Sequence, residues 1–177
     1  AAIEAQATAL DSFYVDGIRH NIPLLSALMN HPRWREGQLS TGFIAEEYPK
    51  GFNASMVPHD DPALLVSVAA YVYRAYTDRG ASVSGQLQGH ERIVSDTWCV
   101  VRLRRRGNEK HMVIARPIQG GYDVEYKGEN YEIRSDWKLG ESLFNGTCNG
   151  QEFTLQVERR RTRYVLFHWG AHASFMV

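Results

Sequence analysis

The chain has 177 residues, of which 44% are hydrophobic and 23% charged, proportions typical of a soluble globular protein with one ordinary domain or a domain plus part of another. Basic and acidic residues balance at 20 each, so no net charge draws the chain toward nucleic acid or an anionic membrane. Two cysteines, Cys99 and Cys148, are too few for a disulfide framework or a metal signature, which predicts free thiols.

The first part of the chain predicts short helices that cannot bury a core by themselves. Small and apolar residues at 1–10 are typical of the tail of a helix, and residues 13–18 form a short β-rich run broken by a glycine. Asn21 can cap a helix over Ile22–Met29, and another short helix fits residues 41–48. Because few of these positions are apolar, this part needs neighbours, and we expect the sequence to be a piece of a longer protein.

A long helix over residues 62–79 is predicted to be the centre of the fold. Asp61 offers an N-cap, Pro62 suits the first helical position and Gly80 suits the end. Residues 63–73 carry no charge, and a helix that is apolar on all sides must be surrounded by other structure. The uncharged run is too short to cross a bilayer, so we expect the rest of the chain to enclose this helix.

A loop and a series of strands follow the helix. Residues 80–91, GASVSGQLQGHE, form a long connection of a kind that is often functional. Short strands with regular turn signals come next, and Asn149-Gly150 is the strongest hairpin signal among them. The predicted strands are 94–106, 112–117, 121–126, 130–137, 141–147, 151–158, 164–169 and 171–177. The predicted fold class is α+β, a central long helix surrounded by an eight-stranded antiparallel β-barrel and preceded by short helices.

The sequence does not indicate a particular catalytic activity. His168 and His172 are separated by Gly170 in a strand or turn, where the spacing that makes helical histidines converge on a metal does not apply. We find no nucleophile-base motif and no glycine-rich phosphate loop, so an enzyme that acts on a small molecule inside the barrel is the weakest interpretation.

Two arginine clusters, within residues 102–106 and 159–163, favour a different interpretation. Arginine side chains can bind phosphate groups, so a free-standing barrel that binds nucleic acid or a nucleotide is an alternative interpretation. With a net charge of zero, solvent-facing strand ends balanced by nearby glutamates are the simpler explanation. From pattern alone, an interaction or scaffolding module is the best inference.

Two stretches carry a family resemblance. FYVDGIRHNIPLLSALM at 13–29 is similar to the end of a biotin carboxylase domain. HPRWREGQLSTGFIAEEYPKGF at 31–52 resembles the α subunit of propionyl-CoA carboxylases, members of the biotin-dependent acyl-CoA carboxylase family. The resemblance implies the C-terminal end of a biotin carboxylase domain at 1–52 and a BT domain at 53–177. In that family the BT domain is a long helix inside an eight-stranded barrel.

The resemblance implies a parent ligase that uses ATP, Mg and biotin to convert propionyl-CoA to methylmalonyl-CoA, in the bacterial cytoplasm or the mitochondrial matrix. The implied partners are the carboxyltransferase β subunit and the biotin carboxylase and biotin carrier domains of the same subunit, with no nucleic acid or membrane. The residues that bind ATP and bicarbonate are expected upstream of Ala1. No lysine among Lys50, Lys110, Lys127 and Lys138 has the methionine neighbours of a biotin-attachment site. No catalytic, cofactor-binding or metal-binding residue is therefore carried over to this segment.

In the family a hook-like loop between the helix and the first strand helps to bind the β subunit, and by position it corresponds to residues 81–92. The implied interface residues are Val83, Leu87, Gln88, His90 and Glu91. A flexible connector is the simpler alternative for this loop. The α subunit of a methylcrotonyl- or geranyl-CoA carboxylase is an alternative for the whole chain, because the acyl-CoA is selected on the β subunit.

Overall fold

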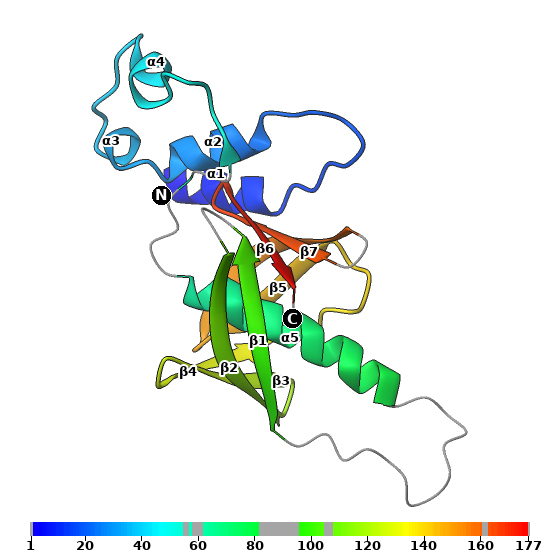
Figure 1. Cartoon of the computed structure of the whole chain (residues 1–177). Helices are drawn as coiled ribbons and strands as arrows, with labels where there is room; N and C mark the ends of the chain where they lie inside the picture. Colours follow the sequence, from blue (N-terminus) through cyan, green and yellow to red (C-terminus); the bar gives the residue numbers. More distant parts are fainter. Residues whose placement is uncertain are drawn as a thin grey trace, which may run out of the picture.

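The computed structural model of this protein describes residues 2–54, 57, 62–81, 96–104, 108–160 and 163–176. In these ranges five helices precede eight strands, and Figure 1 shows the first four helices gathered at one end of a barrel that holds the fifth. The helices are α1 (Ala2–Asp11), α2 (Ile22–Met29), α3 (Pro32–Arg35), α4 (Phe43–Glu47) and α5 (Ala63–Ala81). None of the helices in the described ranges combines the length and the apolar character needed to cross a membrane.

The strands form one closed barrel in which each strand pairs antiparallel with its neighbours in the sequence. They are β1 (Thr97–Arg104), β2 (Asn108–Ile118), β3 (Gly121–Tyr126), β4 (Glu129–Arg134), β5 (Leu143–Cys148), β6 (Gln151–Arg160), β7 (Arg163–His168) and β8 (Ala171–Met176). The last strand closes the barrel on the first, with Met176 opposite Arg102. The predicted α+β fold, a barrel around a central helix, is therefore confirmed.

Four hairpins in the described chain turn within two residues, and three of these turns share one backbone geometry. Lys127-Gly128, Asn149-Gly150 and Trp169-Gly170 each have positive φ at both positions, the geometry whose twist matches antiparallel strands. The hairpins predicted at Lys127-Gly128 and Asn149-Gly150 are thus confirmed. Gly170 has a second constraint, because a Cβ atom there would lie 2.6 Å from the backbone nitrogen of Ala27 in α2.

The barrel interior is filled by α5, as the uncharged run of the sequence predicted. Leu65, Val66, Val68 and Val72 are buried against side chains from the strands. Inward-facing strand residues in this core include Val101, Val113, Val124, Ile133, Phe144, Leu155, Leu166 and Phe175. Full burial of each large apolar side chain stabilises the fold by about 1.5–3 kcal/mol, so α5 is a main source of stability. The helix runs to Ala81, which places Gly80 in its last turn.

The prediction of a β-rich run at residues 13–18 is wrong. The structure has no strand there, and Phe13 and Ile18 are 63% and 70% exposed. A strand needs a neighbour to pair its backbone groups, and no described strand forms a ladder with this segment. The helix at Ile22–Met29 has the predicted bounds, although the side chain of Asn21 makes no capping hydrogen bond.

Candidate functional site

The candidate site is the mouth of the barrel at which the predicted docking loop is attached. Helix α5 ends there at Ala81, and β1 begins there at Thr97. In Figure 1 the end of α5 and the start of β1 lie on the side of the barrel that is remote from α1–α4. The mouth therefore holds both stems of the connection between helix and barrel.

Four side chains tie these stems together, and we call them the loop-stem cluster: Arg74, Asp78, Thr97 and Tyr122. Arg74 is fully buried and its guanidinium donates a hydrogen bond to the hydroxyl of Thr97. The same guanidinium lies 3.4 Å from the carboxylate of Asp78, one turn along α5, and 5.4 Å from the ring centre of Tyr122. The hydroxyl of Tyr122 donates to Asp78. The cluster thus links α5 to β1 and β3.

The electrostatics of the loop-stem cluster explain its arrangement. A buried guanidinium is costly unless a carboxylate and hydrogen-bond partners compensate its charge, and Asp78, Thr97 and Tyr122 do so here. Burial and the hydrogen bond to Asp78 raise the pKa of Tyr122, which therefore stays a neutral phenol that donates to the carboxylate. The cluster holds α5 against β1 and β3 and contains no group poised for nucleophilic attack.

The predicted interface residues Val83, Leu87, Gln88, His90 and Glu91 lie outside the described residues, so their assignment stays a prediction. The structure brings together the two elements that flank them, α5 and β1. Sequence reasoning missed the loop-stem cluster, because arginine is seldom fully buried. The available signal was the position of Arg74 directly after the uncharged run at residues 63–73.

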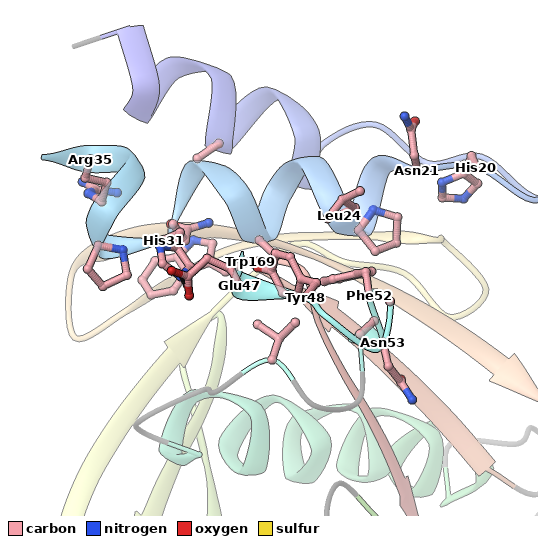
Figure 2. A pocket seen from close by; sticks show the side chains of 18 of the residues that line it. His20, Asn21, Leu24, His31, Arg35, Glu47, Tyr48, Phe52, Asn53 and Trp169 are labelled. Atoms are coloured by element: carbon pink, nitrogen blue, oxygen red, sulfur yellow. Dashed lines mark ion pairs between the residues drawn. The ribbon is translucent and has the colours of Figure 1, made fainter. Parts of the chain in front are cut away.

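A wide groove of about 1690 Å³ lies at the other end of the barrel, between α1–α2 and the chain that follows α4. Figure 2 shows His31, Tyr48 and Phe52 along the side of α2 that faces the barrel, with Trp169 of the β7–β8 turn among them. His31 lies 3.2 Å from the carboxylate of Glu47. Within the groove lining that the structure describes, this pair has no nucleophile beside it, so the groove is an apolar surface with ion pairs at its side.

A buried carboxylate joins the helices to the barrel beside this groove. Asp11, at the end of α1, accepts hydrogen bonds of 3.2 Å from the hydroxyl of Ser26 and from the backbone N–H of Trp169. Burial raises the pKa of Asp11 to about 7, against the lowering effect of these two bonds. The side-chain amide of Gln156 donates to the backbone oxygens of Asp11 and Phe13 at 3.3 Å. Sequence reasoning missed this junction, because its partners are far apart in the chain.

Described arginines of the second cluster have partners within the chain. Arg160 pairs with Glu158 at 2.7 Å, and Arg159 lies over the ring of Tyr76. This pairing favours the simpler explanation, solvent-facing strand ends.

Among the described residues, no group of three or more His, Cys, Asp or Glu side chains is placed to hold a metal ion. Cys99 and Cys148 are free thiols, as predicted.

Comparison with known proteins identifies the barrel. The family described as the propionyl-coenzyme A carboxylase BT domain matches residues 65–177, which contain most of α5 and all eight strands.

Relatives extend the likeness to the helical part. The propionyl-CoA carboxylase alpha chain of Ruegeria pomeroyi is 41% identical over 157 residues, covering 89% of this chain and 23% of the relative. The mitochondrial alpha chain of Rattus norvegicus is 29% identical over 161 residues, covering 88% of this chain and 21% of its own length. The mitochondrial alpha chain of Caenorhabditis briggsae is 33% identical over 170 residues, covering 90% of this chain and 23% of its own length. The chain thus spans less than a quarter of each of these relatives, and with its barrel matched as a unit it belongs to the propionyl-CoA carboxylase BT domain family.

Proposed function

We propose that this chain docks the α subunit of a biotin-dependent acyl-CoA carboxylase on the carboxyltransferase β subunit. The observation that carries the proposal is the loop-stem cluster, in which a buried arginine fixes the end of α5 to the start of β1. A docking loop held by rigid stems loses less conformational entropy on binding than a loop attached to flexible chain. The connection between these stems is the segment in which the family resemblance places the hook.

In this proposal the chain supplies assembly and no reacting group. The parent enzyme uses ATP and bicarbonate to carboxylate biotin, and the carboxyl group then moves to an acyl-CoA on the β subunit. Docking raises the effective concentration of the carrier at both active sites. We place biotin, ATP and Mg in other parts of the α subunit, since no lysine of this chain has the methionine neighbours of a biotin-attachment site. The names of the relatives favour propionyl-CoA as the acyl substrate and a bacterial or mitochondrial location.

The proposal divides the chain at residue 52, with the end of the biotin carboxylase domain before it and the BT domain after it. The division is supported by apolar side chains that the first part leaves exposed, namely those of Phe13, Ile18, Leu39 and Ile44. The groove beside α2 is a second apolar surface on this part. We assign both surfaces to contacts with the rest of the biotin carboxylase domain.

The test is co-elution of the α and β subunits on size exclusion. In the full α subunit, Leu87→Asp together with His90→Asp is expected to abolish co-elution, because two carboxylates would be desolvated in the interface. The matched control is Asn145→Asp with Gln151→Asp, which adds the same charge at exposed positions on β5 and β6. Normal co-elution of the loop variant would reject the docking loop.

A further inference from the structure

The outer face of β1 and β2 is apolar where a solvent-facing barrel surface is normally polar. We call it the β1–β2 patch: Trp98, Val100, Met112 and Ile114. Trp98 is 70% exposed, Met112 65% and Val100 43%, while Ile114 is half-buried. The strand register places Trp98 opposite Ile114 and Val100 opposite Met112. Side chains directly opposite one another in an antiparallel pair share one face, so the four residues form a continuous surface.

Pairs on other strands present polar groups outward. Asp123 pairs with Glu132 across β3 and β4, and Asn145 pairs with Thr154 across β5 and β6. Among strand residues whose side chains the structure describes, the exposed large apolar ones all lie on β1 and β2. A contiguous apolar patch rimmed by polar residues marks a contact surface, and an exposed tryptophan is the residue most often found as an anchor.

Two cations border the patch on its next rung. Arg102 lies directly opposite Lys110, and both side chains are exposed. Like charges at directly opposite positions destabilise a sheet. Within the part of the chain that the structure describes, neither residue has an ion pair, whereas Arg116 at the other border is paired with Asp96 and Glu125. The unbalanced pair is therefore a place where a carboxylate would bind favourably.

We propose that the β1–β2 patch is a second contact surface for the carboxyltransferase β subunit, which meets it with an apolar side chain followed by a carboxylate. The apolar side chain packs on Trp98 and Met112, and the carboxylate lies between Arg102 and Lys110. The identity of the partner rests on the proposed function; the surface itself rests on burial and charge.

The position of the patch favours the β subunit over other occupants. Trp98 follows Thr97, the first residue of β1 after the docking loop. A partner bound to that loop is therefore placed to contact β1 as well. The helices α1 and α2 contact β6 and the β7–β8 turn, and Figure 1 shows them remote from the start of β1. A single loop is also smaller than a standard interface of about 1,600 Å², and the patch enlarges it.

The experiment measures the Kd of the full α subunit for the β subunit by biolayer interferometry. Trp98→Ser with Met112→Ser is expected to raise Kd about 30-fold or more, the effect of removing an anchor residue. Arg102→Glu with Lys110→Glu is expected to weaken binding and to remove part of its salt dependence. The control is Asn145→Ser with Gln151→Ser, which shortens two exposed side chains on β5 and β6, strands that do not pair with β1 or β2.

A Kd within twofold of wild type for both patch variants, each with a normal melting curve, would overturn the proposal. A loss of self-association of α without a change in Kd for β would overturn it in favour of a second copy as occupant. If the docking-loop variant alone loses binding, the β1–β2 patch fails and the proposed function stands. If neither the loop nor the patch variants change Kd, the proposed function fails too.

Discussion

Replacing Asp11 with asparagine tests how the helical part is held on the barrel. The carboxylate is buried and accepts hydrogen bonds from Ser26 and from the backbone N–H of Trp169. An asparagine oxygen accepts the same bonds at nearly the same volume and carries no charge at any pH. The substitution therefore removes only the titration.

The magnitude follows from linkage between protonation and folding. The pKa of Asp11 is about 7 in the folded chain, against an ordinary value of 3.8. At a pH between these two pKa values, Asp11 is protonated in the folded chain and ionised in the unfolded chain. Its contribution to the free energy of unfolding is therefore complete below about pH 4 and is lost as the pH rises toward 7. A difference of about three between the two pKa values corresponds to at most about 4 kcal/mol. Water that reaches the site will reduce that figure.

The assay is urea unfolding of wild type and Asp11→Asn from pH 5 to pH 8. Burial lowers the pKa of His111, which makes both chains more stable as pH rises through the acidic range. The informative quantity is therefore the difference in unfolding free energy between the two chains at each pH, in which His111 cancels. We expect the unfolding free energy of the asparagine variant to increase relative to that of wild type as the pH rises. The difference should become constant above about pH 7. A constant difference from pH 5 to pH 8 would refute the assignment.

Three further substitutions probe the fold. Val68→Asp places a charge in the barrel core, where the wild-type side chain is fully buried, and is expected to abolish the folded circular dichroism spectrum; a normal melting curve would contradict this. Gly170→Ala inserts a Cβ against α2 at a positive φ, so limited proteolysis should release the helical part while the barrel stays intact. Asp78→Ala leaves Arg74 undercompensated and should cost about 1–3 kcal/mol by urea unfolding. Adding Arg74→Met should restore part of that loss, and no recovery would argue against a charge-based role.

The central helix and the barrel were predictable because their signals are local. An uncharged run at residues 63–73 and paired turn residues such as Asn149-Gly150 act within a few positions. The segment at 13–18 has a β-rich composition and still forms no strand, because composition does not supply a neighbour to pair with.

The parts that sequence reasoning missed depend on long-range contacts. Asp11 meets the backbone of Trp169 from the opposite end of the chain, and no pattern near Asp11 indicates that partner. From the sequence alone, Arg74 is expected at the solvent-facing end of a helix, whereas in the folded barrel it is fully buried. The exposure of Trp98 and Met112 also had no signal, because alternation in a strand does not say which face is covered.

The join between β1 and β8 has a consequence for the order of folding. In the described part of the chain Arg102 to Arg104 pair across it, and they meet residues at the far end of the barrel sequence. Contacts of such long sequence separation form slowly, because a large loop must close before they contribute. Since α5 precedes every strand and cannot enter a finished barrel, we expect the strands to collapse around the helix first. The β1–β8 join then forms last, and in unfolding experiments it should open before any hairpin.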